Sequence, residues 1–372
     1  MLDYFSKAKP GIAAAIETSL NLYAKEYEDV SADLGQDAAK RLKEFALRGK
    51  MLRGCLVRLG FELVNGRAVS NTDEQAICRS GAALELFQSG LLIHDDIMDR
   101  DRVRRGQETV HVGYERSLAE GSYDDPEHYG EALGICAGDL AYFAAFSLLS
   151  SFPPSSGTAQ CACSLAAREL ALVGIAQMQD VVNGAVRAQT KNSFRPAVSA
   201  DPSEEGILKL YRYKTGRYTF SLPLSLGASL AGADPLVKTI LEQAGEVLGL
   251  LFQLKDDELG LFGNEAELGK NIGSDIRENK KTLFRLKLLA EVSNEQKKKL
   301  ESIFGNHRAS EKDVSYVIDL LEKMGIRDTV QILMKDYAKQ ALDGMDALLA
   351  VASPETAQAF HELVSYSLER ES

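Results

Sequence analysis

Apolar residues recur along this chain at the three- and four-residue spacing of amphipathic helices, and alternating strand-like stretches are hard to find. Residues that end helices interrupt this pattern near 121–130, 152–157, 192–206, 232–235, 263–274 and 305–310. The richest apolar stretches between the interruptions span residues 77–99, 132–150, 165–188 and 236–260. Several are apolar on more than one face, as helices inside a large bundle are. We therefore expect an all-α fold, a single domain over residues 1–372 with roughly ten or more helices around a central cavity.

The composition narrows the classes of function. The chain has 372 residues, of which 45% are hydrophobic, and a net charge of −11 without any basic tract, which argues against nucleic-acid binding. Its five cysteines show no zinc-binding spacing, so we expect reduced thiols and a cytoplasmic protein. The first residues do not resemble a signal peptide. No apolar run reaches the roughly 18 to 20 residues of a membrane span, so no transmembrane segment is predicted.

Carboxylates gather at the ends of two of the apolar stretches. Asp95, Asp96 and Asp99 end the first stretch, and Asp256 and Asp257 end the second. Residues four apart share one face of a helix, so Asp95 and Asp99 point the same way. Such oxygen ligands suit Mg²⁺, which combines few carboxylates with substrate phosphates. The alternative is a solvated acidic face, and the apolar segments directly before both clusters argue against it.

Cationic residues accompany both aspartate clusters along the sequence. They are Lys50, Arg53, Arg104, Arg105, Lys214, Lys270 and Lys280. Taken singly, each is better interpreted as a solvated side chain or a helix cap. Together they would bring cations for phosphates and carboxylates for metals to one helical scaffold. The residues themselves therefore predict a site that could hold a diphosphate between two metal-binding clusters.

From about residue 49 to residue 286 the chain resembles the trans-type polyprenyl diphosphate synthases, and its pattern is most similar to that of geranylgeranyl diphosphate synthases. The motifs that carry this resemblance are Asp95–Asp99 with Arg104–Gly106, Gln177–Asp180, Lys214–Gly216, Phe252–Asp257 and Lys270–Thr282. The resemblance implies the isoprenoid synthase fold and a homodimer. It also implies head-to-tail condensation of isopentenyl diphosphate with an allylic diphosphate, giving a C20 (geranylgeranyl) or similar all-trans prenyl diphosphate.

The resemblance further implies a role for each motif. The allylic diphosphate would bind with roughly three Mg²⁺ ions, held by Asp95, Asp96, Asp99 and Asp256. The same diphosphate would be contacted by Arg104, Lys214 and Lys270. Isopentenyl diphosphate would be bound by Lys50, Arg53, Gln88 and Arg105. The allylic carbocation would be faced by oxygens of Thr215, Gln253 and the Lys214 carbonyl. The released pyrophosphate would be the base, and Gly260, where many members have a third aspartate, leaves one metal contact in doubt.

The length of the product depends on the residues before the first aspartate cluster. In the family the position five residues before the first aspartate sets the floor for the growing chain, and here it is Gly90, with Leu91 beside it. A glycine leaves this space open, so we expect Phe87, one turn deeper, to form the floor and Gly90→Phe to shorten the product. The alternative is that Gly90 serves a contact between helices.

Two further interpretations of the sequence remain open. A class I terpene cyclase or head-to-head synthase also uses aspartate clusters with Mg²⁺, but it needs no second diphosphate site of the kind that Lys50, Arg53 and Arg105 suggest. A non-catalytic subunit of a heteromeric synthase tends to lose aspartates of the first motif, and all three are present here. Dependence on isopentenyl diphosphate, and activity of the single purified chain, would distinguish these interpretations.

Overall fold

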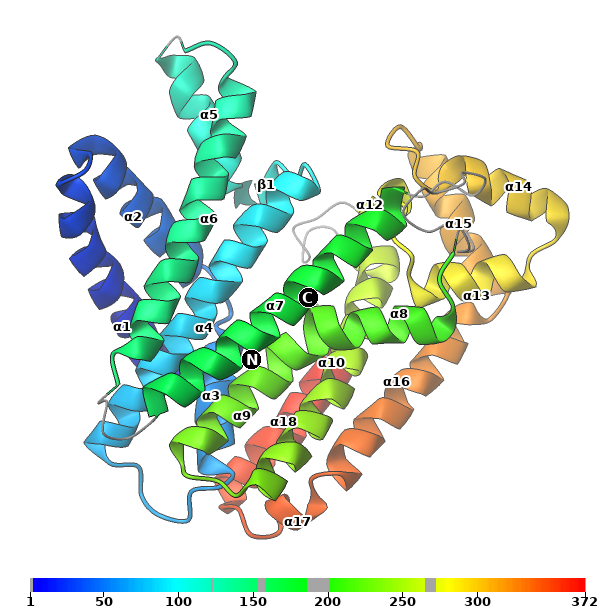
Figure 1. Ribbon diagram of the computed structural model, residues 1–372. Helices are drawn as coiled ribbons and strands as arrows, with labels where there is room; N and C mark the ends of the chain where they lie inside the picture. Colours follow the sequence, from blue (N-terminus) through cyan, green and yellow to red (C-terminus); the bar gives the residue numbers. More distant parts are fainter. Residues whose placement is uncertain (1–2, 122, 153–157, 186–200, 265–271, 372) are drawn as a thin grey trace. The chain divides into compact units, whose positions relative to one another are not determined.

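Helices form all the long elements of the computed structural model, which describes residues 3–121, 123–152, 158–185, 201–264 and 272–371 (Figure 1). The α-helices of the first half are α1 (Asp3–Glu28), α2 (Ala32–Leu47), α3 (Leu52–Glu62), α4 (Asn71–Met98), α5 (Val110–Glu120), α6 (Pro126–Ser150) and α7 (Thr158–Ala185). Those of the second half are α8 (Glu204–Tyr211), α9 (Leu222–Leu230), α10 (Pro235–Phe262), α12 (Ser274–Arg277), α13 (Leu283–Glu291), α14 (Asn294–Ile303), α15 (Glu311–Lys323), α16 (Ile326–Asp343), α17 (Asp346–Leu349) and α18 (Pro354–Glu369). A π-helix, η2 (Arg212–Ser221), follows α8, and two short strands, β1 (Val103–Arg104) and β2 (Gln107–Glu108), form an antiparallel pair. The predicted all-α class is confirmed.

The contacts within the chain divide it into two compact units. Unit 1 comprises Met1–Ala167, Leu222–Glu242 and Ala347–Phe360, and unit 2 comprises Arg168–Ser221, Gln243–Asp346 and His361–Ser372. Each unit is therefore described by itself below. The expectation of one domain over the whole chain stays a prediction.

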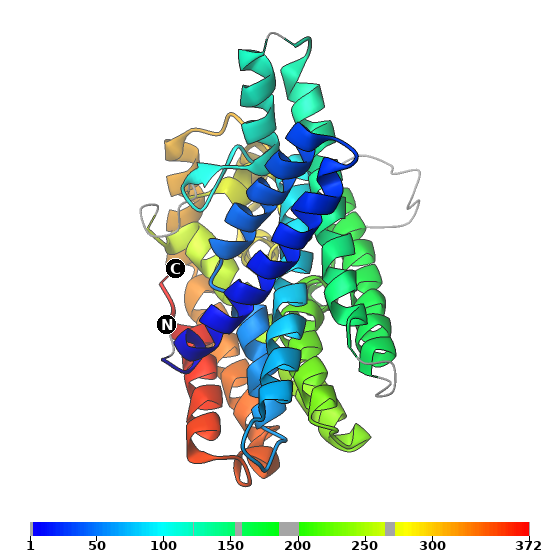
Figure 2. The same ribbon diagram turned by 90° about the vertical axis from the view of Figure 1, so that its left-hand side faces the viewer.

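Helix α4 is the central element of unit 1, and it packs against α1, α3 and α6 (Figure 2). A capping box fixes its first turn, since Ser70 and Asp73 each accept a hydrogen bond from the other's backbone N–H. Its middle is buried on more than one face, including Leu84 and Phe87, both at 0% exposure. Because the helix runs through the core and ends at Met98, its last turn carries the first aspartate cluster out of an apolar environment.

Two glycines let α3 and α9 approach to backbone contact within unit 1. A Cβ atom on Gly60 of α3 would lie 2.2 Å from the Leu224 carbonyl oxygen of α9. A Cβ atom on Gly227 of α9 would lie 2.0 Å from the Val57 carbonyl oxygen of α3. Both distances are far below van der Waals contact, so any larger residue would force the helices apart.

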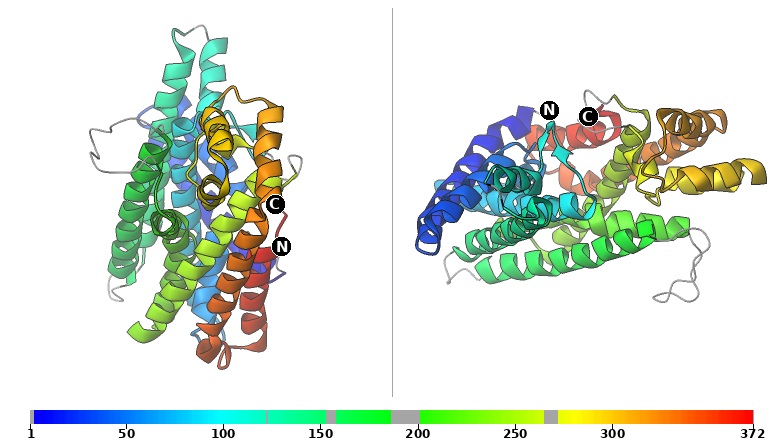
Figure 3. Two further views of the ribbon diagram at one scale, coloured as in Figure 1. Left: turned by 90° about the vertical axis from the view of Figure 1, so that its right-hand side faces the viewer. Right: turned by 90° about the horizontal axis from the view of Figure 1, so that it is seen from above.

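The helices that follow α12 make up much of unit 2. Helix α13 packs against α15 and α16, which also pack against each other (Figure 3). The Thr282 side chain caps the start of α13 by accepting a hydrogen bond from the Arg285 N–H at 3.3 Å. Leu283, Phe284 and Leu288 of α13 are completely buried. These contacts fix the start of α13 in the core of unit 2.

Among the residues that the structure describes, two helices are long and apolar enough to cross a membrane. They are α6, with a mean hydropathy of 1.7, and residues 160–185 of α7, with 1.3. The expectation concerned an uninterrupted apolar run, whereas this finding is a mean hydropathy over stretches that include polar residues. Core helices of soluble proteins pass the same test, so two such helices are weak evidence for a membrane.

The contact between α3 and α9 predicts a large difference between two glycine substitutions. Gly227→Ala should lower the free energy of unfolding by about 2 kcal/mol or more, because its Cβ would overlap the backbone of α3. Gly174→Ala in α7 is the control, since no atom lies within 4 Å of its added Cβ, and it should raise that free energy by roughly 0.5 kcal/mol. Urea unfolding measures both, and an unchanged midpoint for Gly227→Ala would contradict the packing argument.

Candidate active site

The first aspartate cluster lies at the end of α4, where a tight hairpin returns an arginine to it. Arg105 (φ 53°) and Gly106 (φ 71°) form the turn between β1 and β2, as a type I′ hairpin requires. The turn brings the Arg104 Nε to donate to Asp96, while its Nη2 lies 3.5 Å from Asp101. The Asp96 side chain is completely buried, whereas 24% of the Asp95 side chain is exposed. Arg104 therefore has a fixed position beside an accessible carboxylate.

Burial governs the ionisation of Asp96. It raises the pKa of this carboxyl group to about 7, and the neighbouring Arg104 guanidinium acts in the opposite direction. Breaking such a buried pair leaves an uncompensated charge, which is far more costly than losing a surface ion pair. The Asp96–Arg104 ion pair thus holds the hairpin against the end of α4.

Arg105 of the hairpin reaches the start of α3 in unit 1, where Arg53 lies close to it and Lys50 is its neighbour in the sequence; these three residues are called the cationic cluster below. Met51 precedes the helix with a left-handed backbone (φ 53°), and the buried Glu85 of α4 accepts a hydrogen bond from the Gly54 N–H at 2.8 Å. Burial raises the pKa of Glu85, while Arg53 and Arg105 oppose that rise. The Arg105 guanidinium lies over this segment, since a Cβ on Gly49 would be 3.2 Å from its Nη1.

Helix α6 approaches Gly90 closely, while the expected open pocket for the growing product stays a prediction. A Cβ on Gly90 would lie 2.6 Å from the Tyr142 ring and 2.8 Å from the Gly138 carbonyl oxygen of α6. Phe87 packs edge to face on Phe146, with 4.8 Å between ring centroids. Gly90 is therefore a close contact between α4 and α6, which is the alternative that the sequence left open.

In unit 2, η2 and α10 hold the predicted carbocation-facing residues side by side. The two helices touch through glycines, because a Cβ on Gly249 of α10 would lie 1.9 Å from the Gly216 Cα. The wider turn of the π-helix, a feature often found at functional sites, carries Thr215 to α10, where its hydroxyl donates to the Gln253 Oε1 at 2.7 Å. The Lys214 ammonium group donates a hydrogen bond to the Asp180 carboxylate of α7, so the motifs Lys214–Gly216 and Gln177–Asp180 contact each other.

A buried hydrogen-bond network lies directly behind this pair. The Gln253 Nε2 donates to the Asp257 Oδ1 at 3.0 Å, and the Tyr211 hydroxyl donates to the Asp257 Oδ2. Tyr211 also accepts a hydrogen bond from the Leu283 N–H at 3.3 Å. Burial and the nearby Asp275 raise the pKa of Asp257, while the hydrogen bonds donated by Tyr211 and Gln253 oppose the rise because they stabilise the carboxylate. Asp257 therefore faces the protein interior, unlike its neighbour Asp256, whose side chain is 43% exposed.

An arginine near the end of α18 pairs with Asp256. The Arg370 guanidinium donates to the Asp256 Oδ1 and, at 3.0 Å, to the Phe252 carbonyl oxygen. It also lies over the Phe252 ring, 3.7 Å from the centroid. Only 7% of the Arg370 side chain is exposed. A basic cluster is absent from this end of the sequence, but this one arginine contacts the second aspartate motif directly.

The Asp275 carboxylate lies where the missing third aspartate of the second motif would be. A Cβ on Gly260 would be 3.1 Å from the Asp275 Oδ2, and the Gly273 N–H donates to the Gly260 carbonyl at 3.0 Å. Lys280 lies 3.3 Å from the other Asp275 oxygen. Gly260 therefore leaves room for a carboxylate that comes from a different part of unit 2.

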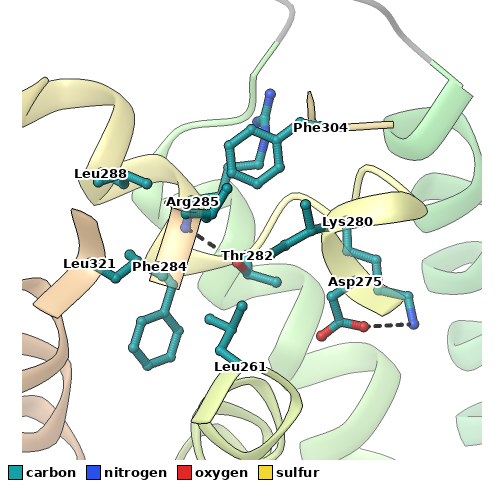
Figure 4. A pocket seen from close by; sticks show the side chains of 11 residues that line it. Leu261, Asp275, Lys280, Thr282, Phe284, Arg285, Leu288, Phe304 and Leu321 are labelled. Atoms are coloured by element: carbon teal, nitrogen blue, oxygen red, sulfur yellow. Dashed lines mark hydrogen bonds and ion pairs between the residues drawn. The ribbon is translucent and has the colours of Figure 1, made fainter. Parts of the chain in front are cut away.

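A pocket in unit 2 lies behind this group (Figure 4). Its wall is mostly apolar and includes Leu261, Phe284 and Leu321. Asp275 and Lys280 lie together at one side, and the Arg285 guanidinium is 4.9 Å from the centroid of the Phe304 ring. The pocket belongs to the packing of α13 against its neighbours and does not contain the predicted metal ligands.

The predicted residues thus form two groups that the structure describes separately. Unit 1 brings together Asp95, Asp96 and Arg104, with Arg105 close to Arg104 and Arg53, and Asp99, Lys50 and Gln88 belong to the same unit. Unit 2 brings together Lys214, Thr215, Gln253 and Asp256. Lys270 lies outside the described residues. Within the described part of the chain, no three carboxylate, histidine or cysteine side chains form a metal site by themselves.

Several residues at these sites were not singled out from the sequence. They are Glu85, Tyr211 and Arg370. Glu85 carries a usable signal, since a carboxylate in the middle of an apolar helix must find partners. No such signal marks Tyr211 or Arg370 in the sequence, because the residues that they contact are far away along the chain.

Comparisons with known proteins agree with this arrangement. A family model described as polyprenyl synthetase matches residues 37–321. The chain is 31% identical over 333 residues to a geranylgeranyl diphosphate synthase of Sulfolobus acidocaldarius, covering 89% of each protein. It is 30% identical over 328 residues to the Saccharolobus solfataricus protein of the same name, covering 88% of each.

A solved structure gives the same result. The geranylgeranyl pyrophosphate synthase of Corynebacterium glutamicum, complexed with isoprenyl diphosphate and magnesium, aligns with a TM-score of 0.82 at 28% identity, covering 96% of this chain and 98% of that one. The predicted family is therefore confirmed. The chain belongs to the polyprenyl synthetase family and is a prenyltransferase with the all-α isoprenoid synthase fold.

Proposed function

We propose that this chain condenses isopentenyl diphosphate with an allylic diphosphate, head to tail, to give geranylgeranyl diphosphate (C20) or a similar all-trans product. The observation that carries this proposal is the cationic cluster of Lys50, Arg53 and Arg105, which the hairpin and the start of α3 bring together. A second diphosphate site has a use in an elongating synthase and none in a cyclase. The names of the relatives support the C20 product.

The carboxylates fit a divalent cation. The side chains of Asp95, Asp99 and Asp256 have carboxylate oxygens that solvent can reach, and oxygen atoms are the ligands that Mg²⁺ prefers. We assign these three to Mg²⁺ and Asp96 to holding Arg104, because the Asp96 side chain is completely buried against that guanidinium. Bound Mg²⁺ would offset the negative charge of the leaving diphosphate. Magnesium in the Corynebacterium relative supports the choice of ion.

The cations beside the aspartates would orient the two substrates. Arg104 and Lys214 would contact the allylic diphosphate, together with Lys270 of the segment that the structure does not describe. Lys50, Arg53 and Arg105 would hold isopentenyl diphosphate, with Gln88 nearby. Guanidinium groups suit this task because their planar donors match phosphate oxygens.

The chemical step requires little covalent participation by the protein. The allylic C–O bond breaks, the double bond of isopentenyl diphosphate attacks the cation, and a proton leaves for the departing pyrophosphate. Oxygens of Thr215 and Gln253, 2.7 Å apart, and the Lys214 carbonyl would face the transient positive charge. Fixed dipoles of this kind stabilise charge as it develops without having to reorganise.

The apolar residues left exposed on two helices support a homodimer. Phe143 of α6 is 68% exposed, and Ile175 and Met178 of α7 are each 66% exposed. Only 39% of the most apolar 18-residue stretch of α6 is buried. A second copy of the chain would cover such surfaces, as homodimer interfaces do. We propose a homodimer in the cytoplasm.

The proposed function predicts a specific dependence on both substrates. With Mg²⁺, isopentenyl diphosphate and a C5, C10 or C15 allylic diphosphate, the purified chain should give a C20 product by mass spectrometry. Arg53→Gln should raise the KM for isopentenyl diphosphate by roughly tenfold or more, since it removes a charge-assisted phosphate contact, and leave the KM for the allylic substrate nearly unchanged.

The matched control is Arg116→Gln, which alters an exposed ion pair with Glu108 in the same unit. It should change neither KM. A hydrocarbon product from the allylic diphosphate alone would show a cyclase instead. Complete inactivity of the single chain would favour the non-catalytic subunit.

The contact between Arg370 and Asp256 predicts an effect on metal binding. Arg370→Gln should tighten Mg²⁺ binding in the presence of a non-hydrolysable diphosphate by roughly threefold to tenfold, because a cation would no longer compete for the carboxylate. Isothermal titration calorimetry measures this affinity. The control is Lys287→Gln, which removes an ion pair with the exposed Glu204 in the same unit and should leave this affinity unchanged. Equal or weaker binding by the Arg370 variant would contradict the competition.

The close contacts at Gly90 change the variant that can test Phe87 as the floor for the growing product. Gly90→Phe should disrupt the packing of α4 on α6, so it cannot test the floor. Phe87→Ala removes the ring between α4 and Phe146, and it should shift the product to C25 or longer. Tyr129→Ala, an exposed aromatic elsewhere on α6, should leave the product distribution unchanged. A product that stays at C20 in a folded Phe87 variant would exclude Phe87 as the floor.

A further inference from the structure

We propose that Tyr211 is a positioning residue that sets the direction in which the Thr215 and Gln253 oxygens point. This inference rests on the proposed function, since it concerns the two residues that would face the allylic cation. It extends that function to a side chain buried behind them. The argument depends on the donors and acceptors of one continuous network in unit 2.

The Thr215 hydroxyl can stabilise a cation only if its hydrogen points elsewhere. In the structure that hydrogen goes to the Gln253 Oε1, at 2.7 Å, so the oxygen lone pairs of Thr215 remain available. This arrangement requires the Gln253 amide to keep its oxygen toward Thr215. A rotated amide would present its NH₂ group to Thr215 and would push the hydroxyl hydrogen toward another acceptor or the substrate.

Asp257 prevents this rotation of the amide. Its Oδ1 accepts a hydrogen bond from the Gln253 Nε2 at 3.0 Å, and the residue is only 4% exposed. A rotated Gln253 would place its carbonyl oxygen against a carboxylate oxygen and leave both without a donor, which is costly in a buried site. The orientation of Gln253 therefore depends on where Asp257 is held.

Tyr211 holds Asp257 in that place. Its hydroxyl donates to the Asp257 Oδ2 and accepts from the Leu283 N–H at 3.3 Å, at the first residue of α13. The backbone donor occupies the acceptor side of the hydroxyl, so its hydrogen is directed to Asp257. Tyr211 is 7% exposed and is the last residue of α8, directly before η2 begins. Its ring is thereby fixed by the same backbone that carries Thr215.

The hydrogen bonds of this network all run toward Asp257. One branch passes from Thr215 through Gln253, and the other passes from Leu283 through Tyr211. Removing the tyrosine hydroxyl leaves one carboxylate oxygen of Asp257 and the Leu283 N–H without these partners. Asp257 would then turn to find another donor, and Gln253 would lose its fixed orientation.

Tyr211→Phe tests this role, because it removes a single oxygen and retains the ring. The probes are an ammonium analogue of the allylic diphosphate, which mimics the cation, and its uncharged carbon isostere, both with Mg²⁺. The wild-type chain should prefer the ammonium analogue in calorimetry. The variant should lose roughly tenfold of that preference, and its kcat should fall by a similar factor while both KM values change less than twofold.

Comparing the two analogues separates positioning from general damage. Both carry the same diphosphate and metal, so a distorted site would weaken them equally, and an equal loss would overturn the proposal. Retained preference in the variant would overturn it as well. Tyr213→Phe, in η2 beside the Arg217 side chain, is the matched control and should keep the preference.

A second variant covers the case in which Tyr211→Phe does not fold. Asp257→Asn keeps the size of the side chain but lets it donate as well as accept, so it should lose the same preference, and an unchanged preference would overturn the proposal. If the wild-type chain condenses no isopentenyl diphosphate and shows no preference between the analogues, the proposed function fails first. A wild type that is active and selective, with variants that behave like it, would reject the positioning role alone.

Discussion

The burial of carboxylates beside accessible ones is the constraint on which the other features of this structure depend. Asp96, Glu85 and Asp257 are each nearly inaccessible to solvent. A buried charge without partners is too costly for a protein of ordinary stability. Each of these carboxylates therefore requires particular partners, which are Arg104 for Asp96, the Gly54 N–H for Glu85, and Gln253 with Tyr211 for Asp257.

These pairings give the arginines and the amide beside the aspartate clusters defined positions. Asp96 fixes the arginine of a two-stranded hairpin, Glu85 fixes the start of α3 and lies between two arginines, and Asp257 fixes an amide on its own helix. A flexible arginine would have to be ordered by each substrate, at a cost in side-chain entropy. Here the buried carboxylates order these side chains within the folded chain itself, and Asp95 and Asp256 beside them stay accessible to solvent.

The sequence was sufficient for the family, the helical class and most of the charged residues, because these depend on periodicity and on motifs in order. It was insufficient at Gly90, where only the approach of Tyr142 shows that the glycine serves packing. It also could not place Asp275 beside Gly260 or Arg370 on Asp256, since each pair joins distant parts of the chain. The local hydrophobic pattern of the sequence predicts which face of a helix is buried, but it does not predict which residue covers that face.

The π-helix η2 has a consequence for how this chain can vary. A π-helical segment contains a widened turn, so it behaves as an α-helix into which an extra residue has been inserted. Losing one residue from Arg212–Ser221 would rotate everything on one side of the gap by about 100° relative to the other, the angle per residue of a regular helix. Thr215 and Gly216 could not then both face α10. In this segment the structure therefore constrains the number of residues more strictly than it constrains which residues they are. Insertions and deletions in homologous chains should be found in the surface loops instead.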